Sequence, residues 1–132
     1  MIRHVTTPAV PEPVPSRYSN CLVANGTIYI SGQHAGAPGG GLLGDGTVLD
    51  QARQAMRKVV ALVEAAGANA SDIVKLTIFL VDMTRFADIG TVRMEFFSAP
   101  LPCSSLIGVN ALVSPDLLVE IEAIAVMPST PT

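Results

Sequence analysis

Residues Val119 to Val126 read Val-Glu-Ile-Glu-Ala-Ile-Ala-Val, and this alternation of residue types predicts a β-strand. Alternate side chains of a strand point to the same face, so Glu120 and Glu122 share one face, roughly 7 Å apart. Two acids in an apolar strand have two possible explanations. The pair could belong to the solvated face of an antiparallel sheet. Alternatively, at least one of the two carboxylates faces a cleft and transfers protons there.

The composition indicates one compact and unusually apolar domain. The chain has 132 residues, of which 49% are hydrophobic and 14% are charged. This length suffices for one domain with a real core. No apolar run reaches the length of a membrane-spanning helix, so the surplus of apolar residues suggests burial between subunits.

Charge and cysteine content restrict the possible partners. The net charge of -3 gives no basic footprint, so nucleic acid is not an expected partner. Two cysteines and two histidines supply no metal-ligand cluster, and no metal site is expected. The amino terminus lacks the residue order of a signal peptide, which predicts an unprocessed cytoplasmic protein.

The first part of the chain predicts an extended segment followed by a hairpin. Residues 1–15 are expected to form an extended lead-in, because they are rich in proline. The segments Asn20–Ala24 and Thr27–Ser31 flank Asn25-Gly26, and this arrangement is typical of a β-hairpin with a tight turn.

A long helix is predicted next. Apolar residues recur at helical spacing from Leu49 to Ala66, and Gly67 stands where a C-terminal cap belongs. Thr47 and Asp50, three residues apart, resemble a capping box with Asp in place of Glu.

The second half of the chain predicts strands around a second helix. The apolar segment Ile73–Val81 predicts a strand covered on both faces. Asp82 can cap a helix from about Met83 to Phe97, and Ser104–Val109 is a further strand candidate. The whole chain, residues 1–132, is interpreted as a single domain with a flexible tail at residues 128–132.

These elements leave one face of the predicted sheet without a cover. Two helices can cover one face, but no other element remains for the second. The sheet is therefore expected to pack against copies of itself.

Several short motifs, in this order and spacing, resemble the Rid family, also called YjgF/YER057c/UK114 or L-PSP endoribonuclease-like. They are Arg17-Tyr18-Ser19-Asn20, Ser31-Gly32-Gln33, Gln51-Ala52, Glu64-Ala65-Ala66-Gly67, Asp72-Ile73-Val74-Lys75, Asp82-Met83, Phe96-Phe97, Pro102-Cys103-Ser104-Ser105 and the strand from Val119 to Ala125. The resemblance implies an α+β, chorismate-mutase-like fold, with two helices on one face of a mixed sheet. It also implies a homotrimer, in which the sheets form a central barrel and small-molecule metabolites bind in clefts between subunits.

The resemblance further implies an activity and a set of site residues. Members of the family hydrolyse enamines and imines, such as 2-aminoacrylate, to 2-keto acids and ammonia without any cofactor. Glu120 matches the glutamate that positions water, Tyr18 matches a pocket tyrosine, and Ser31 with Gly32 matches the pocket's Ser-Gly element. These matches predict Glu120 as the catalytic residue and the other three as substrate-binding residues.

The family arginine that grips the substrate carboxylate does not transfer, because Ser104 stands in its place. A serine hydroxyl carries no charge, and losing such a contact costs about 2 to 4 kcal/mol of carboxylate binding. The sequence therefore predicts an altered substrate, with Ser104 as a candidate contact. Arg17 could supply the missing cation and His34 could act as an acid or base, although a solvated or surface loop residue is the favoured interpretation of each.

The sequence also gives expectations for two further residues and leaves three candidate functions. Arg93 is expected in an interface or surface ion pair, and Cys103 is expected to be a buried structural thiol. The leading function is an enamine or imine deaminase. The alternatives are a trimer that binds a metabolite without turnover and, less favoured because of the acidic balance, a ribonuclease.

Overall fold

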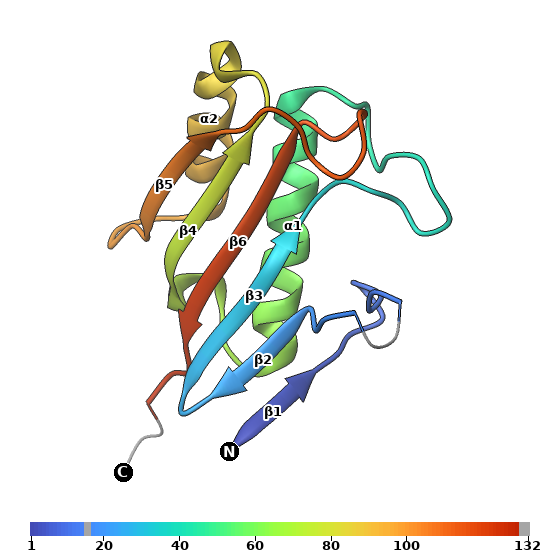
Figure 1. Cartoon of the computed structure of the whole chain (residues 1–132). Helices are drawn as coiled ribbons and strands as arrows, with labels where there is room; N and C mark the ends of the chain where they lie inside the picture. Colours follow the sequence, from blue (N-terminus) through green and yellow to red (C-terminus); the bar gives the residue numbers. More distant parts are fainter. Residues whose placement is uncertain (15–16, 130–132) are drawn as a thin grey trace.

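The computed structural model describes residues 1–14 and 17–129. Pro15 of the expected lead-in, Ser16, and residues 130–132 of the expected tail lie outside the described residues. The fold is α+β, as predicted, with one mixed sheet and two helices (Figure 1). The strands are β1 (Ile2–Val5), β2 (Cys21–Ala24), β3 (Thr27–Gln33), β4 (Ile73–Leu80), β5 (Cys103–Gly108) and β6 (Val119–Val126).

The sheet has the strand order β1-β2-β3-β6-β4-β5, in which only β4 and β5 are parallel neighbours. The helices α1 (Val48–Ala66) and α2 (Phe86–Phe96) lie on the same face of this sheet (Figure 1). The side chains of strand β6 alternate between the two faces of the sheet, as the sequence predicted. Its four buried residues contribute to the core beneath the helices, and they are Val119, Ile121, Ala123 and Ala125. The intervening residues, including both glutamates, belong to the opposite face, which we call the open face.

The predicted hairpin is confirmed. Strands β2 and β3 pair antiparallel around Asn25 and Gly26, which both have positive φ angles (51° and 79°). An Asn-Gly pair tolerates this left-handed conformation, and its twist matches that of the flanking strands. The strand preceding this hairpin, β1, was not predicted as such: residues within the expected lead-in pair with β2.

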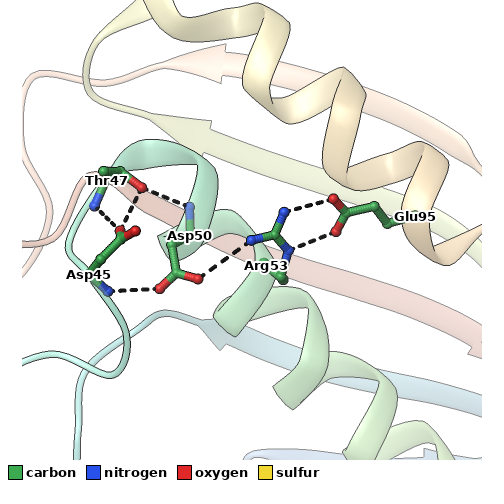
Figure 2. A network of polar contacts seen from close by, with 5 residues as sticks. All are labelled: Asp45, Thr47, Asp50, Arg53 and Glu95. Atoms are coloured by element: carbon green, nitrogen blue, oxygen red, sulfur yellow. Dashed lines mark hydrogen bonds and ion pairs between the residues drawn. The ribbon is translucent and has the colours of Figure 1, made fainter.

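Helix α1 begins with a network of polar contacts that differs from a simple capping box (Figure 2). The Thr47 hydroxyl accepts a hydrogen bond from the Asp50 backbone N–H at 3.1 Å, as predicted. The Asp50 carboxylate accepts from the backbone N–H of Asp45 instead of that of Thr47. The Thr47 N–H donates to the Asp45 carboxylate. In a capping box one acidic side chain accepts from the N–H of the cap residue, whereas here Asp45 accepts from Thr47 and Asp50 accepts from Asp45.

Helix α2 is shorter than predicted. A single 3₁₀ turn, Met83–Arg85, precedes it, and Asp82 caps this turn by accepting from the Thr84 N–H at 3.0 Å. Arg53 of α1 connects the two helices through a bidentate ion pair with Glu95 of α2, with contacts of 2.7 and 2.8 Å (Figure 2).

Strand β4 is apolar mainly toward the helices, where Ile73, Leu76, Ile78 and Leu80 are buried. Its other side belongs to the open face and is mixed in polarity, because the polar residues Lys75 and Thr77 share it with Phe79. Among the described residues, no helix combines the length and the hydropathy needed to cross a bilayer.

Candidate active site

Glu120 of β6 lies directly over Gly32 of the neighbouring strand β3. The register between the two strands shifts between Ile30 and Gln33, and this bulge brings Gly32 under the carboxylate. A Cβ atom at Gly32 would lie only 2.7 Å from Cδ and 2.9 Å from Cγ of Glu120. A methyl group at position 32 would force the Glu120 carboxylate to move, so glycine permits the position that this carboxylate occupies.

The half-buried position of Glu120 changes its acidity. Burial raises the pKa of the Glu120 carboxyl, and the nearby Glu122 carboxylate raises it further. Glu122 is exposed on the same face of the sheet, which agrees with the prediction that the two acids share a face. A carboxyl group with a raised pKa is a candidate for proton transfer, because perturbed acidity is common among catalytic acids and bases.

A cavity of about 460 Å³ contains three of the predicted site residues, Tyr18, Gly32 and His34. The lead-in, the glycine-rich loop and Lys58 of α1 supply its other walls. His34 Nδ1 accepts a hydrogen bond from the Gly36 N–H at 3.0 Å. Burial and the charge of Lys58 lower the pKa of His34, and both favour the neutral imidazole.

Within the chain, Ser31 connects β3 to the segment before β2 through two hydrogen bonds. Its hydroxyl donates to the Ser19 carbonyl at 2.6 Å, and its backbone N–H donates to the Asn20 carbonyl. These bonds hold the segment that carries Tyr18 beside β3. Ser31 also lines a shallower cavity on the open face, together with Glu122.

Ser104 lies in a different part of the chain. It is on β5, which is separated from β3 by β6 and β4, or by about 14 Å at ordinary strand spacing. Its hydroxyl accepts a hydrogen bond from Nη1 of Arg93 at 2.8 Å. The two residues line a cavity of about 280 Å³ between α2 and β5. Arg17 is exposed and lines neither this cavity nor the one around Tyr18.

The structure bears on two expectations from the sequence. Arg93 makes no surface ion pair within the described residues and instead contacts Ser104, so only an ion pair at a subunit interface stays a prediction. Arg93 lies three residues after Gly90 and four before Phe97, and this spacing indicates that the three residues share one side of the helix. Cys103 is exposed, not buried, because its position opposite Lys75 in the β4–β5 register places it on the open face.

The described chain thus presents two groups of candidate residues at separate places. Tyr18, Gly32, His34 and Glu120 gather around β3, whereas Ser104 and Arg93 lie at the β5 edge of the sheet. Within the described residues, no group of three His, Cys, Asp or Glu side chains is placed to hold a metal ion.

Comparison with known proteins agrees with this architecture. The model of the Endoribonuclease L-PSP family matches residues 10–127. A 2-iminobutanoate/2-iminopropanoate deaminase from Dermatophagoides farinae is 38% identical, over 95% of this chain and 96% of the relative. A RutC family protein from Pyrococcus horikoshii is 36% identical, over 92% and 94% of the two chains.

Solved structures show the same fold. Escherichia coli TdcF with bound serine has a TM-score of 0.85 and 35% identity, covering 96% of this chain and 99% of that one. RidA from a Psychrobacter species has a TM-score of 0.84 and 30% identity, covering 95% and 99%. The chain therefore belongs to the Endoribonuclease L-PSP family, which is the Rid or YjgF/YER057c/UK114 family that its motifs resemble.

Proposed function

We propose that this protein is a cofactor-free hydrolase that converts small imines, and the enamines that tautomerise to them, to keto compounds and ammonia. The observation that carries the proposal is the half-buried Glu120 carboxyl, seated over Gly32 with a raised pKa. The relatives named as 2-iminobutanoate/2-iminopropanoate deaminases support the reaction class.

Glu120 would move the protons of this hydrolysis. Its carboxylate accepts a proton from water as the water oxygen attacks the imine carbon, and the proton passes to the imine nitrogen. The resulting carbinolamine carries one hydroxyl and one amino group on the same carbon. The hydroxyl proton is then transferred through Glu120 to the nitrogen, the C–N bond breaks, and ammonia leaves. The net reaction is imine plus water to ketone plus ammonia.

The other candidate residues would bind the substrate and set its range. Tyr18 and His34 line the cavity next to Gly32, and a neutral His34 offers a polar contact without a charge. Ser104 lies too far away to join them within one chain, so we propose that a second subunit of a homotrimer supplies it.

A coupled assay tests this proposal. A pyridoxal-phosphate threonine dehydratase generates 2-iminobutanoate, and ammonia and 2-oxobutanoate are measured with and without this protein. We expect acceleration above buffer, and a loss of about 10²- to 10⁴-fold in Glu120→Gln. Glu122→Gln, which removes the same charge from the same face, is the matched control and should retain turnover at pH 8. Gly32→Ala should lose activity while remaining folded, since its methyl group displaces the Glu120 carboxylate.

A trimer that binds a metabolite without turnover is the second candidate, and the replacement of the family arginine by Ser104 favours it. It predicts that 2-oxobutanoate raises the thermal unfolding midpoint while ammonia release stays at the buffer rate. Release above the buffer rate that depends on Glu120 would eliminate this candidate.

A further inference from the structure

The Arg93 side chain is held over the surface of its own helix. Its Nη1 atom donates to Ser104 Oγ at 2.8 Å. Its Nη2 atom lies 3.9 Å from the position that a Cβ would occupy on Gly90, so the side chain folds back toward the preceding turn.

The charge of this guanidinium has no carboxylate partner among residues 1–14 and 17–129. The arginine ion pairs in this part of the chain belong to Arg53 and Arg85. Ser104 is neutral and occupies one of five N–H donors. Arg93 also stands in the last turn of α2, where the helix dipole favours a cation. The dipole supplies only a partial charge, and within the part of the chain that the structure describes the other guanidinium donors have no protein acceptor.

The surroundings of Arg93 are apolar. The walls of its cavity of about 280 Å³ include Met94, Phe97, Leu101 and Pro102. A partly desolvated guanidinium with free in-plane donors is the arrangement that binds a carboxylate in a bidentate manner. An apolar lining suits the short alkyl chain that would follow such a carboxylate.

We propose that Arg93 binds the substrate carboxylate, and that Ser104 positions the guanidinium instead of contacting the substrate alone. This inference rests on the proposed function. It limits the preferred substrates to imines of 2-keto acids, which carry a carboxylate, and disfavours uncharged imines. The cation absent from position 104 is thus supplied by the neighbouring helix. The structure of E. coli TdcF, a relative of 35% identity, has bound serine, a ligand that carries a carboxylate.

Calorimetric titration of the purified protein with sodium 2-oxobutanoate and, separately, with uncharged butan-2-one tests the role of the charge. Arg93→Gln should weaken 2-oxobutanoate binding about 10- to 100-fold, the loss of a charge-assisted contact, and leave butan-2-one binding unchanged. Arg93→Lys should retain part of the affinity, because a point charge remains without the planar fork. Arg57→Gln, an exposed arginine on α1, controls for the change in net charge.

A second pair of variants separates positioning from general structural support. Ser104→Ala should raise the KM several-fold with little change in kcat, because the guanidinium keeps its charge but loses its hydrogen bond. Arg93→Gln combined with Ser104→Arg returns a guanidinium to the cavity from β5 and should recover much of the lost affinity. Thermal unfolding of every variant shows whether each is folded.

The outcomes distinguish this inference from the proposed function. Equal 2-oxobutanoate affinity in wild type and Arg93→Gln would overturn the role of Arg93, even if imine hydrolysis is observed. An equal loss for butan-2-one and 2-oxobutanoate would also overturn it, because the charge would then not matter. Charge-dependent binding without ammonia release would support the role of Arg93 and refute the hydrolase.

Discussion

The exposed Glu122 carboxylate acts on Glu120 through space, since both side chains occupy the open face of β6. A negative charge near a carboxyl disfavours its ionised form and raises its pKa. Burial is the larger cause of the raised pKa of Glu120, and it persists whatever residue occupies position 122. The two causes can therefore be separated by substitution.

Removing the Glu122 charge should shift the activity profile to lower pH. In Glu122→Gln, the pKa of Glu120 falls because the like charge is gone, so the carboxylate that we propose as the proton-transfer group persists in more acidic solution. The acidic limb of kcat/KM should move downward in pH, but only partly, because burial still opposes ionisation. Rate profiles from pH 4 to 8 measure this shift. Glu64→Gln, on the exposed side of α1, should leave the limb in place, and an upward shift in Glu122→Gln would contradict the assignment.

At the scale of the element, the start of α1 depends on the Thr47 hydroxyl. It accepts from the Asp50 N–H, one of the helix N–H groups that lack an intrahelical partner. Thr47→Ala should lower the free energy of unfolding by about 1 kcal/mol. The thermal midpoint should fall by about 3 to 5 °C for a domain of this size. Calorimetry at fixed protein concentration measures the change.

The matched control for this cap is Thr91→Ala in the exposed middle of α2. Its hydroxyl contacts the Ala87 carbonyl within the same helix at 3.3 Å, so no cap is lost. Alanine is the better helix former, and this variant should be at least as stable as the wild type. A Thr47→Ala protein as stable as Thr91→Ala would show that the acidic side chains around Thr47 suffice as a cap.

The sequence predicts the elements well where a local pattern determines them. The alternation of β6 and the Asn25-Gly26 turn each depend on residues within a few positions of one another. Strand β1 carries no such signal: it is four residues long, and its pairing with β2 makes it a strand. The contact between Arg93 and Ser104 joins two different elements, so helical spacing alone could not reveal it. The bulge that seats Gly32 under Glu120 is also a property of the pairing with β6.

At the scale of the whole molecule, the candidate site is divided between distant parts of one sheet. The group around Glu120 and Gly32 lies near β3, and the group around Arg93 and Ser104 lies at the β5 edge. A contact between one edge of a chain and a different part of the next chain is heterologous, and it closes into a ring when the rotation permits. We therefore expect complete sites only where copies of the chain meet.

The open face offers the apolar surface for such an assembly. Side chains of Tyr29 and Ile124 are 49% and 36% exposed there, and Ile107 of β5 is 41% exposed. Both helices, α1 and α2, lie on the opposite face, so no helix among the described residues covers this one (Figure 1). Apolar side chains gathered on one sheet face favour burial against another protein surface.

Ile124→Asp tests the assembly and the divided site together. Wild-type protein should sediment at about three times the chain mass of 13.7 kDa. A charge at position 124 would be buried without a partner in the assembly, so the variant should sediment as single chains at micromolar concentration. Turnover should be lost as well, because the proposed site needs Arg93 and Ser104 of one chain beside Glu120 of another. Val113→Asp, which places the same charge on an exposed loop, should preserve both properties. A monomeric Ile124→Asp protein with full activity would locate the whole site within one chain, and a monomeric wild type would contradict the assembly itself.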